Sequence, residues 1–199
     1  MWTNKLLLVM ELLHQKAFGK GGIFKRIFLI KQRVCPYTMA YFYPGLAHRL
    51  IGVKGREDAF VLGIKKFMKA IDEWPSFYST YIGLNPRLSL PRYIVVDFIA
   101  LHELRHKAQF TRKTKLFSPK SVVPYLRDFI PMFSQKHLAA FLGDVCHKLQ
   151  KLTPKADFPR NELDACVIEG IALYLWDRYE RDEEKLLLKY FPRLILLGS

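Results

Sequence analysis

The most specific chemical pattern in this chain is the run His102-Glu103-Leu104-Arg105-His106, which reads H-E-x-x-H. On an α-helix, side chains four positions apart lie on one face, so both imidazoles can bind a single Zn²⁺. Glu103 lies beside them and can act on a metal-activated water. A single histidine on an apolar helix face is more often a core residue than a ligand. Two in register with this glutamate instead predict a zinc site.

A catalytic zinc usually has three protein ligands and one open position. The compact extension H-E-x-x-H-x-x-G-x-x-H is absent, because Gln109 and Arg112 occupy its last two defined positions. A more distant carboxylate is therefore expected. Glu162 and Glu169 lie seven residues apart on one face of the predicted last helix, and either could be the third ligand. Glu162 is preferred for its first-turn position, and the other carboxylate would line the cleft or hold a ligand histidine.

These motifs resemble those of the gluzincins, metallopeptidases with H-E-x-x-H on one helix and a glutamate ligand on a later helix. Residues 102–109 resemble small gluzincin-like peptidases that read H-E-x-x-H-x-x-Q and continue to an E-x-x-A helix. Residues 162–165, E-L-D-A, are similar to that second element. Residues 169–174, E-G-I-A-L-Y, equally look like the E-G-x-A-x-Y form of other gluzincin branches. The resemblance covers a small part of the chain and indicates a superfamily rather than a family.

The length of 199 residues suits one domain, and we predict a single zincin-like metallopeptidase domain over residues 1–199. Its expected class is α+β, compact and dominated by helices, with an active-site helix and a small sheet. The resemblance implies peptide-bond hydrolysis by a zinc-activated water, with Glu103 as general base. Tyr174 is a candidate for contact with the oxyanion or the cleft, although core packing is its plainer explanation.

A net charge of +14 favours acidic partners, which include nucleic acid, anionic membrane surfaces and acidic protein segments. No Asp or Glu occurs between positions 104 and 127, and basic residues fill this stretch: Arg105, Lys107, Arg112, Lys113, Lys115, Lys120 and Arg127. Because the run starts within the zinc motif, its first members should frame the cleft. They would steer an acidic polypeptide substrate to the zinc or bring the protein to nucleic acid.

Two alternative functions use the same scaffold. The first is a nucleic-acid-associated zincin, for DNA-linked proteolysis or for binding alone, which the charge supports. No helix-turn-helix or zinc-finger pattern accompanies it. The second is a non-catalytic zincin-fold protein, against which the intact Glu103 argues.

Cysteine usage and hydropathy indicate the compartment. Cys35, Cys146 and Cys166 are odd in number and widely spaced, which predicts no disulfide framework and favours a reducing environment. No apolar run reaches the length of about 18 residues that a membrane span needs. The short apolar run near the N-terminus is interrupted by Glu11 and lacks a cleavage site. We therefore predict a cytoplasmic rather than secreted protein without a transmembrane segment.

Hydrophobic periodicity predicts the helices and strands that carry these motifs. Helices are predicted over residues 3–18, 57–74, 90–110, 134–149 and 159–190. Pro75 is expected to end the second helix and Ser134 to cap the fourth. Strands are predicted over 23–34 and 77–84, and the latter, at an edge, could pair with an extended substrate.

Overall fold

Helices form most of the structure, and the predicted dominance of helices is confirmed. The computed structural model describes residues 1–19, 26–30, 40–43, 59–81, 90–112, 114–126, 135–152 and 159–199. Its helical elements are α1 (Trp2–Phe18), α2 (Ile64–Tyr81), α3 (Arg92–Thr111), η2 (Val123–Leu126), α4 (Gln135–Leu152), α5 (Arg160–Arg178), α6 (Glu183–Lys185), η3 (Leu186–Tyr190) and α7 (Phe191–Ile195). None of these helices is long and apolar enough to cross a membrane.

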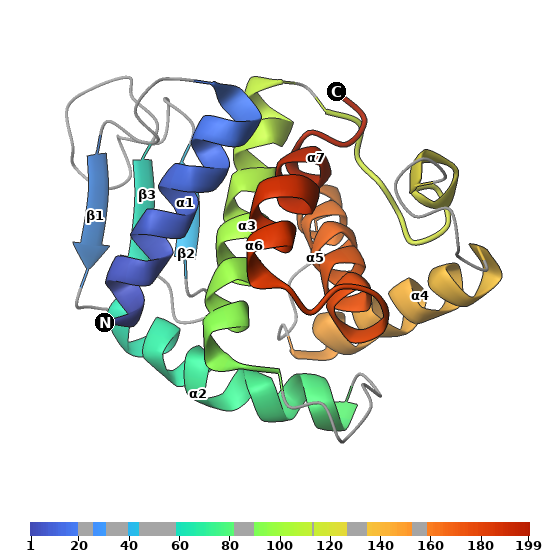
Figure 1. The fold of residues 1–199 in the computed structure, drawn as a ribbon, viewed down its shortest axis with the longest axis horizontal. Coiled ribbons are helices and arrows are strands. Elements are labelled where there is room, and N and C mark those ends of the chain that lie inside the picture. The colour runs from blue at the N-terminus through green and yellow to red at the C-terminus, as the bar shows by residue number, and fades with distance from the viewer. Residues whose placement is uncertain are drawn as a thin grey trace.

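The central element is α3, which runs through the middle of the molecule and contacts both α1 and α5 (Figure 1). Between Ile94 and Leu101 every residue is buried, and all of them except Asp97 are apolar. A helix that is apolar on all sides must be covered on all sides. Pro91 precedes its first turn, where a missing N–H is tolerated, so the predicted start of this helix is confirmed.

Three short strands form a sheet in the order β1-β3-β2. β1 (Arg26–Ile30) pairs parallel with β3 (Ala59–Gly63), and β2 (Ala40–Tyr43) pairs antiparallel with β3 on its other side. β2 is the strand that contacts α3. β3 corrects the helix predicted over residues 57–74, because the helix begins only at Ile64. The run of apolar residues before that position suits a central strand as well as a helix.

The prediction that Pro75 ends a helix is wrong, because Pro75 lies inside α2. Residues 77–81, predicted as part of a strand, continue this helix, and residues 82–84 lie outside the described ranges. Their aromatic composition favours strands only where a neighbouring strand packs beside them, and the described sheet offers none there. The packing of α2 against α3 instead retains the helix across its proline.

The single helix predicted from Pro159 to Tyr190 is also wrong, since it is divided after Arg178. Asp182 caps the new start by accepting a hydrogen bond from the backbone N–H of Lys185, and aspartate favours such caps over helix interiors. The break lets α6, η3 and α7 fold back, so that Phe191 packs against Phe98 of α3 at a ring distance of 6.0 Å. The predicted cap Ser134 lies outside the described residues, and α4 starts at Gln135.

Lys5 connects α1 to the central helix. Lys5 Nζ lies 3.0 Å from Asp97 Oδ1 and also binds Glu183 of α6. Asp97 is almost fully buried, and this burial raises its pKa to about 8, although Lys5 opposes the shift.

The free energy of unfolding should therefore fall as pH rises between about 4 and about 8. In this range Asp97 is still protonated in the folded chain but has lost its proton in the unfolded chain. A single group of this kind changes the free energy of unfolding by at most about 1.4 kcal/mol per pH unit. Asp97→Asn should flatten this part of the profile in denaturant titrations, whereas the exposed-site variant Asp144→Asn should keep it. An equal slope in both variants would contradict this origin.

Candidate metal centre

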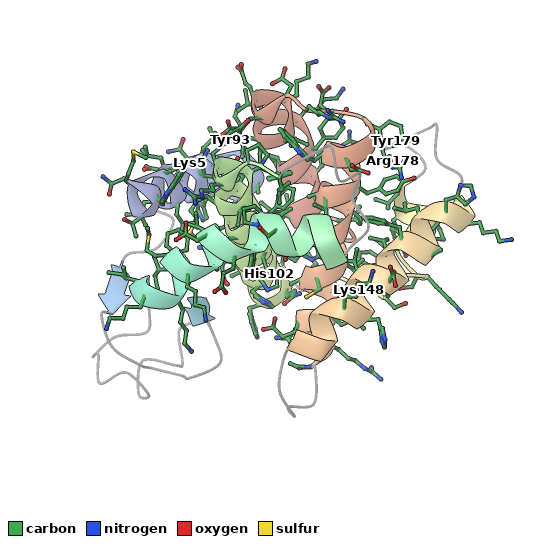
Figure 2. All side chains as sticks on the ribbon, turned by 90° about the horizontal axis from the view of Figure 1, so that it is seen from below. Lys5, Tyr93, His102, Lys148, Arg178 and Tyr179 are labelled. Atoms are coloured by element: carbon green, nitrogen blue, oxygen red, sulfur yellow. The ribbon has the colours of Figure 1, made fainter. Side chains whose placement is uncertain are left out.

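Three side chains from two helices converge at one point. His102 (Figure 2) and His106 are one turn apart on α3, and Glu162 lies in the first turn of α5. The Nε2 atoms of the histidines are 3.2 Å apart. Glu162 Oε1 is 3.3 Å from Nε2 of His106, and its Oε2 is 3.4 Å from Nε2 of His102. These three residues form a group that could hold a metal ion.

The spacing of these atoms suits zinc. Bonds of about 2.0–2.1 Å at tetrahedral angles separate two ligand atoms by about 3.3–3.4 Å. The 3.2 Å between the two Nε2 atoms is close to such an edge, Glu162 brings one oxygen near each nitrogen, and one ligand atom from each of the three residues lies within 4.8 Å of the others. Two imidazoles and a carboxylate also form a common donor set of catalytic zinc. The side chain of Glu162 is 36% exposed, so the cluster is accessible from its own side.

The electrostatics of the cluster favour a positive charge. Burial opposes the charged form of His102, but hydrogen bonds and charges from Glu162 and Glu169 outweigh it and raise the pKa of this histidine well above its usual value. For Glu162, burial acts to raise the pKa, but the two histidines overcome this and hold the pKa well below its usual range. A cation bound among these groups would satisfy the same electrostatic demand.

Glu169 lies on the outer side of the same histidine. Its Oε2 is 3.1 Å from Nδ1 of His102, and it is almost fully buried. An ionised carboxylate can only accept a hydrogen bond, so Nδ1 donates to Glu169, and Nε2 is the nitrogen that faces His106 and Glu162. Sequence reasoning left Glu162 and Glu169 open as third ligand. The structure brings Glu162 to the metal-facing nitrogens and Glu169 to the opposite nitrogen.

Glu103 is buried beside the cluster, and its Oε2 has no hydrogen-bond partner among the described residues. Burial raises the pKa of Glu103, while the neighbouring His102 and His106 act to lower it. An unpartnered buried carboxylate oxygen is costly unless something else binds it. A water or substrate group held in the cluster would be such a partner.

The steering role predicted for Arg105 is wrong, because its side chain is completely buried. All five of its N–H groups donate: to both oxygens of Asp164 at 2.6 and 3.0 Å, and to the carbonyls of Ile195, Leu197 and Lys115 at 2.8 to 2.9 Å. Sequence reasoning placed this arginine at the surface because charged side chains usually lie there. On a helix covered on every side, it needs internal acceptors instead.

Lys107 and Arg112, two other predicted steering residues, lie towards α1. Lys107 is largely buried, with its ammonium 5.7 Å from the ring centre of Phe18. The prediction that Lys107 steers substrate from the surface is therefore also wrong. Arg112 is exposed and its guanidinium also lies over Phe18, at 6.0 Å. Lys113 lies outside the described residues.

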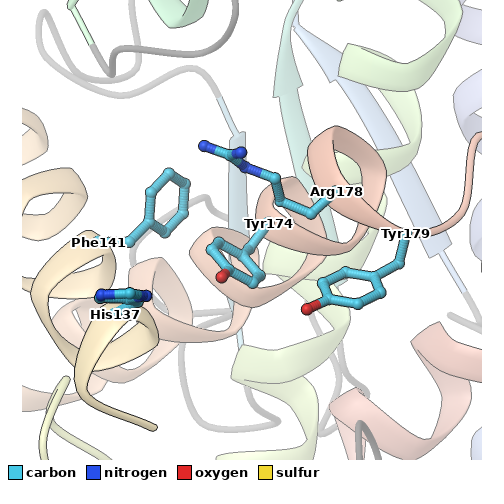
Figure 3. Close-up of a pocket in the computed structure, with 5 residues that line it drawn as sticks. All are labelled: His137, Phe141, Tyr174, Arg178 and Tyr179. Carbon is cyan, nitrogen blue, oxygen red and sulfur yellow. The ribbon is translucent and has the colours of Figure 1, made fainter. Parts of the chain in front are cut away.

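Tyr174 is not brought to the cluster. It lines a pocket of about 400 Å³ together with His137, Phe141, Arg178 and Tyr179 (Figure 3). Its ring packs at 5.0 Å from that of Phe141 on α4. Along α5, positions 162 and 174 are separated by about 18 Å at the usual rise per residue. The structure therefore places Tyr174 in the contact between α4 and α5, far from the metal-facing groups.

Comparisons with known proteins found no matching family model, no similar curated protein and no similar solved structure. Arguments about function therefore rest on the geometry of this chain alone. That geometry includes two residues to which sequence reasoning gave no role, Gln109 and Asp164. The signal for Gln109 was its position three residues after His106, hence on the same helix face.

Asp164→Asn should destabilise the fold by about 3–5 kcal/mol, because it removes the charge that compensates the buried guanidinium of Arg105. The matched control is Asp144→Asn, which breaks an exposed pair with Lys148 and should cost at most about 1 kcal/mol. Denaturant unfolding of both variants with the metal removed by a chelator measures the difference. Equal, small losses would show that the buried pair is not an important interaction.

Proposed function

We propose that this protein is a zinc-dependent metallopeptidase with a helix-dominated, zincin-like α+β domain. In this proposal His102, His106 and Glu162 hold the metal, and Glu103 is the general base. The observation that carries it is the convergence of two Nε2 atoms and one carboxylate in a group that could hold a metal ion, next to a buried glutamate.

The residues divide the chemistry between them. When bound, zinc supplies Lewis-acid activation of water and of the scissile carbonyl. Glu103 accepts the proton of the attacking water and delivers it to the leaving amine. Its raised pKa supports this role, because a general base works best when its pKa approaches the operating pH. Glu169 keeps the ring of His102 in place from behind.

Substrate binding requires a surface that can hold an extended chain. Residues 77–81, which were expected to provide an edge strand, are helical and do not fit this role. β2 is a better candidate, since it lies at one edge of the described sheet and contacts the helix that carries both histidines. A polypeptide added to that edge would form main-chain hydrogen bonds and would run beside α3.

Zinc binding separates the roles of the two glutamates. Wild-type protein should bind close to one zinc per chain, and His102→Ala or Glu162→Ala should lose most of the affinity, because each removes a ligand. Glu169→Ala should cost a smaller factor of about 10–100, as expected for a residue that only orients a ligand. Competition with a chromophoric chelator measures the zinc affinity of all four proteins. Release of zinc by Glu169→Ala alone would reverse the assignment, and full affinity in every variant would exclude this site.

Hydrolysis should depend on Glu103. Glu103→Gln should retain zinc but lower the rate of peptide cleavage by about 10²–10⁴-fold, because an amide cannot accept the proton of the attacking water. Turnover of an unstructured protein such as casein, with zinc content measured in parallel, tests this. Glu11→Gln, an exposed change on α1, serves as the control. Cleavage at the wild-type rate by Glu103→Gln would mean that the activity lies elsewhere.

A further inference from the structure

Gln109 connects the two helices that carry the metal-facing groups. It lies on α3 one turn after His106, and its Oε1 is 2.9 Å from Nδ1 of that histidine. Its Nε2 donates to the backbone carbonyl of Asn161 at 2.9 Å and to Oδ2 of Asp164 at 2.6 Å. Asn161 and Asp164 flank Glu162 in the first turn of α5. Gln109 therefore binds both a histidine of the cluster and the backbone that presents the carboxylate.

The chemistry of these partners determines how the amide is oriented. A backbone carbonyl and an ionised carboxylate can only accept hydrogen bonds, so the NH₂ group of Gln109 must face Asn161 and Asp164. Its carbonyl oxygen then faces His106 and can only accept. Nδ1 of His106 must consequently be the protonated nitrogen. Nε2 is the nitrogen that faces His102 and Glu162, and it is therefore the one that a metal would take.

Asp164 holds this arrangement because each of its oxygens is engaged twice. Oδ2 accepts from Gln109 and from Nε of Arg105, and Oδ1 accepts from Nη2 of Arg105 and from the backbone N–H of Phe117 at 2.8 Å. These four bonds fill the capacity of a carboxylate. Arg105 is in turn held by the carbonyls of Ile195 and Leu197. A continuous series of hydrogen bonds thus joins the C-terminal turn to a metal-facing nitrogen.

We propose that Gln109 is a positioning residue of the proposed metal site, which orients the ring of His106 through Nδ1 and sets the register of α5 on α3. This inference rests on the proposed metal site. Gln109 acts through His106 and does not contact the reacting atoms. Its contribution is preorganisation: without it, the ring of His106 could turn and the first turn of α5 could shift, and the three ligand residues would no longer converge.

Substitution at this position separates a positioning role at the metal site from simple packing. Gln109→Leu keeps the size of the side chain but removes all three hydrogen bonds. It should lower zinc affinity about 10–100-fold and change the visible spectrum of the Co²⁺-loaded protein. Gln15→Leu, the same change at an exposed position of α1, is the control and should match the wild type.

The readouts are zinc competition, the Co²⁺ spectrum and the rise in melting temperature that zinc causes in each variant. Each variant is melted with and without zinc, so this rise reports metal binding separately from the stability of the variant's own fold. If Gln109→Leu binds zinc and Co²⁺ like the wild type, the positioning role is overturned. If the wild type binds neither Zn²⁺ nor Co²⁺, the proposed function itself fails, which is a distinguishable result.

Discussion

The buried ion pair between Arg105 and Asp164 is the interaction on which the arrangement of the proposed metal site depends. Two charges removed from water cost several kcal/mol each, and their attraction offsets this only when every remaining donor and acceptor is satisfied. Here all five N–H groups of Arg105 and all four acceptor positions of Asp164 are used. A pair satisfied this completely tolerates few alternative geometries. It therefore fixes how α5 lies against α3.

That fixed register brings Glu162 to the histidines. Asp164 is two residues after Glu162, so holding its carboxylate against Arg105 also places the first turn of α5 beside His106. The same ion pair also forms hydrogen bonds with the segment at Lys115 and Phe117 and with the C-terminal turn at Leu197. Segments far apart in sequence thus support one small cluster. Because they form a single hydrogen-bonded network, a change in any of them should be felt at the metal-facing atoms.

The sequence was sufficient for features that are local and periodic. The H-E-x-x-H spacing, α1 and the start of α3 at Pro91 depend on neighbours within a few residues, and each could be read from the pattern. The choice between Glu162 and Glu169 could not, because both lie on one helix face and only the position of α5 along α3 separates them. The helical continuation through Pro75 and the break after Arg178 likewise depend on what packs against those segments.

Arg105 shows how a local pattern can mislead. A run of basic residues usually marks a solvated face, and on that basis it supported both substrate steering and nucleic-acid binding. Arg105 and Lys107 are in fact inside the protein, so two charges of the run contribute little to any surface field. The signal was present upstream, where apolar residues occupy every side of α3 from Ile94 to Leu101 except at Asp97. This burial weakens the nucleic-acid alternative more than it weakens the peptidase proposal, which rests on the cluster.

The two histidines have unlike partners, and this difference limits the charge of the site. Glu169 supports His102 with a negative charge, whereas Gln109 supports His106 with a neutral amide. With Glu103 and Glu162 ionised, the three carboxylates already exceed the charge of one divalent cation. A fourth carboxylate in place of the Gln109 amide would bind the cation more tightly but would weaken the cation's capacity to polarise water and carbonyl groups. The neutral amide of Gln109 therefore orients His106 without adding a further negative charge to the cluster.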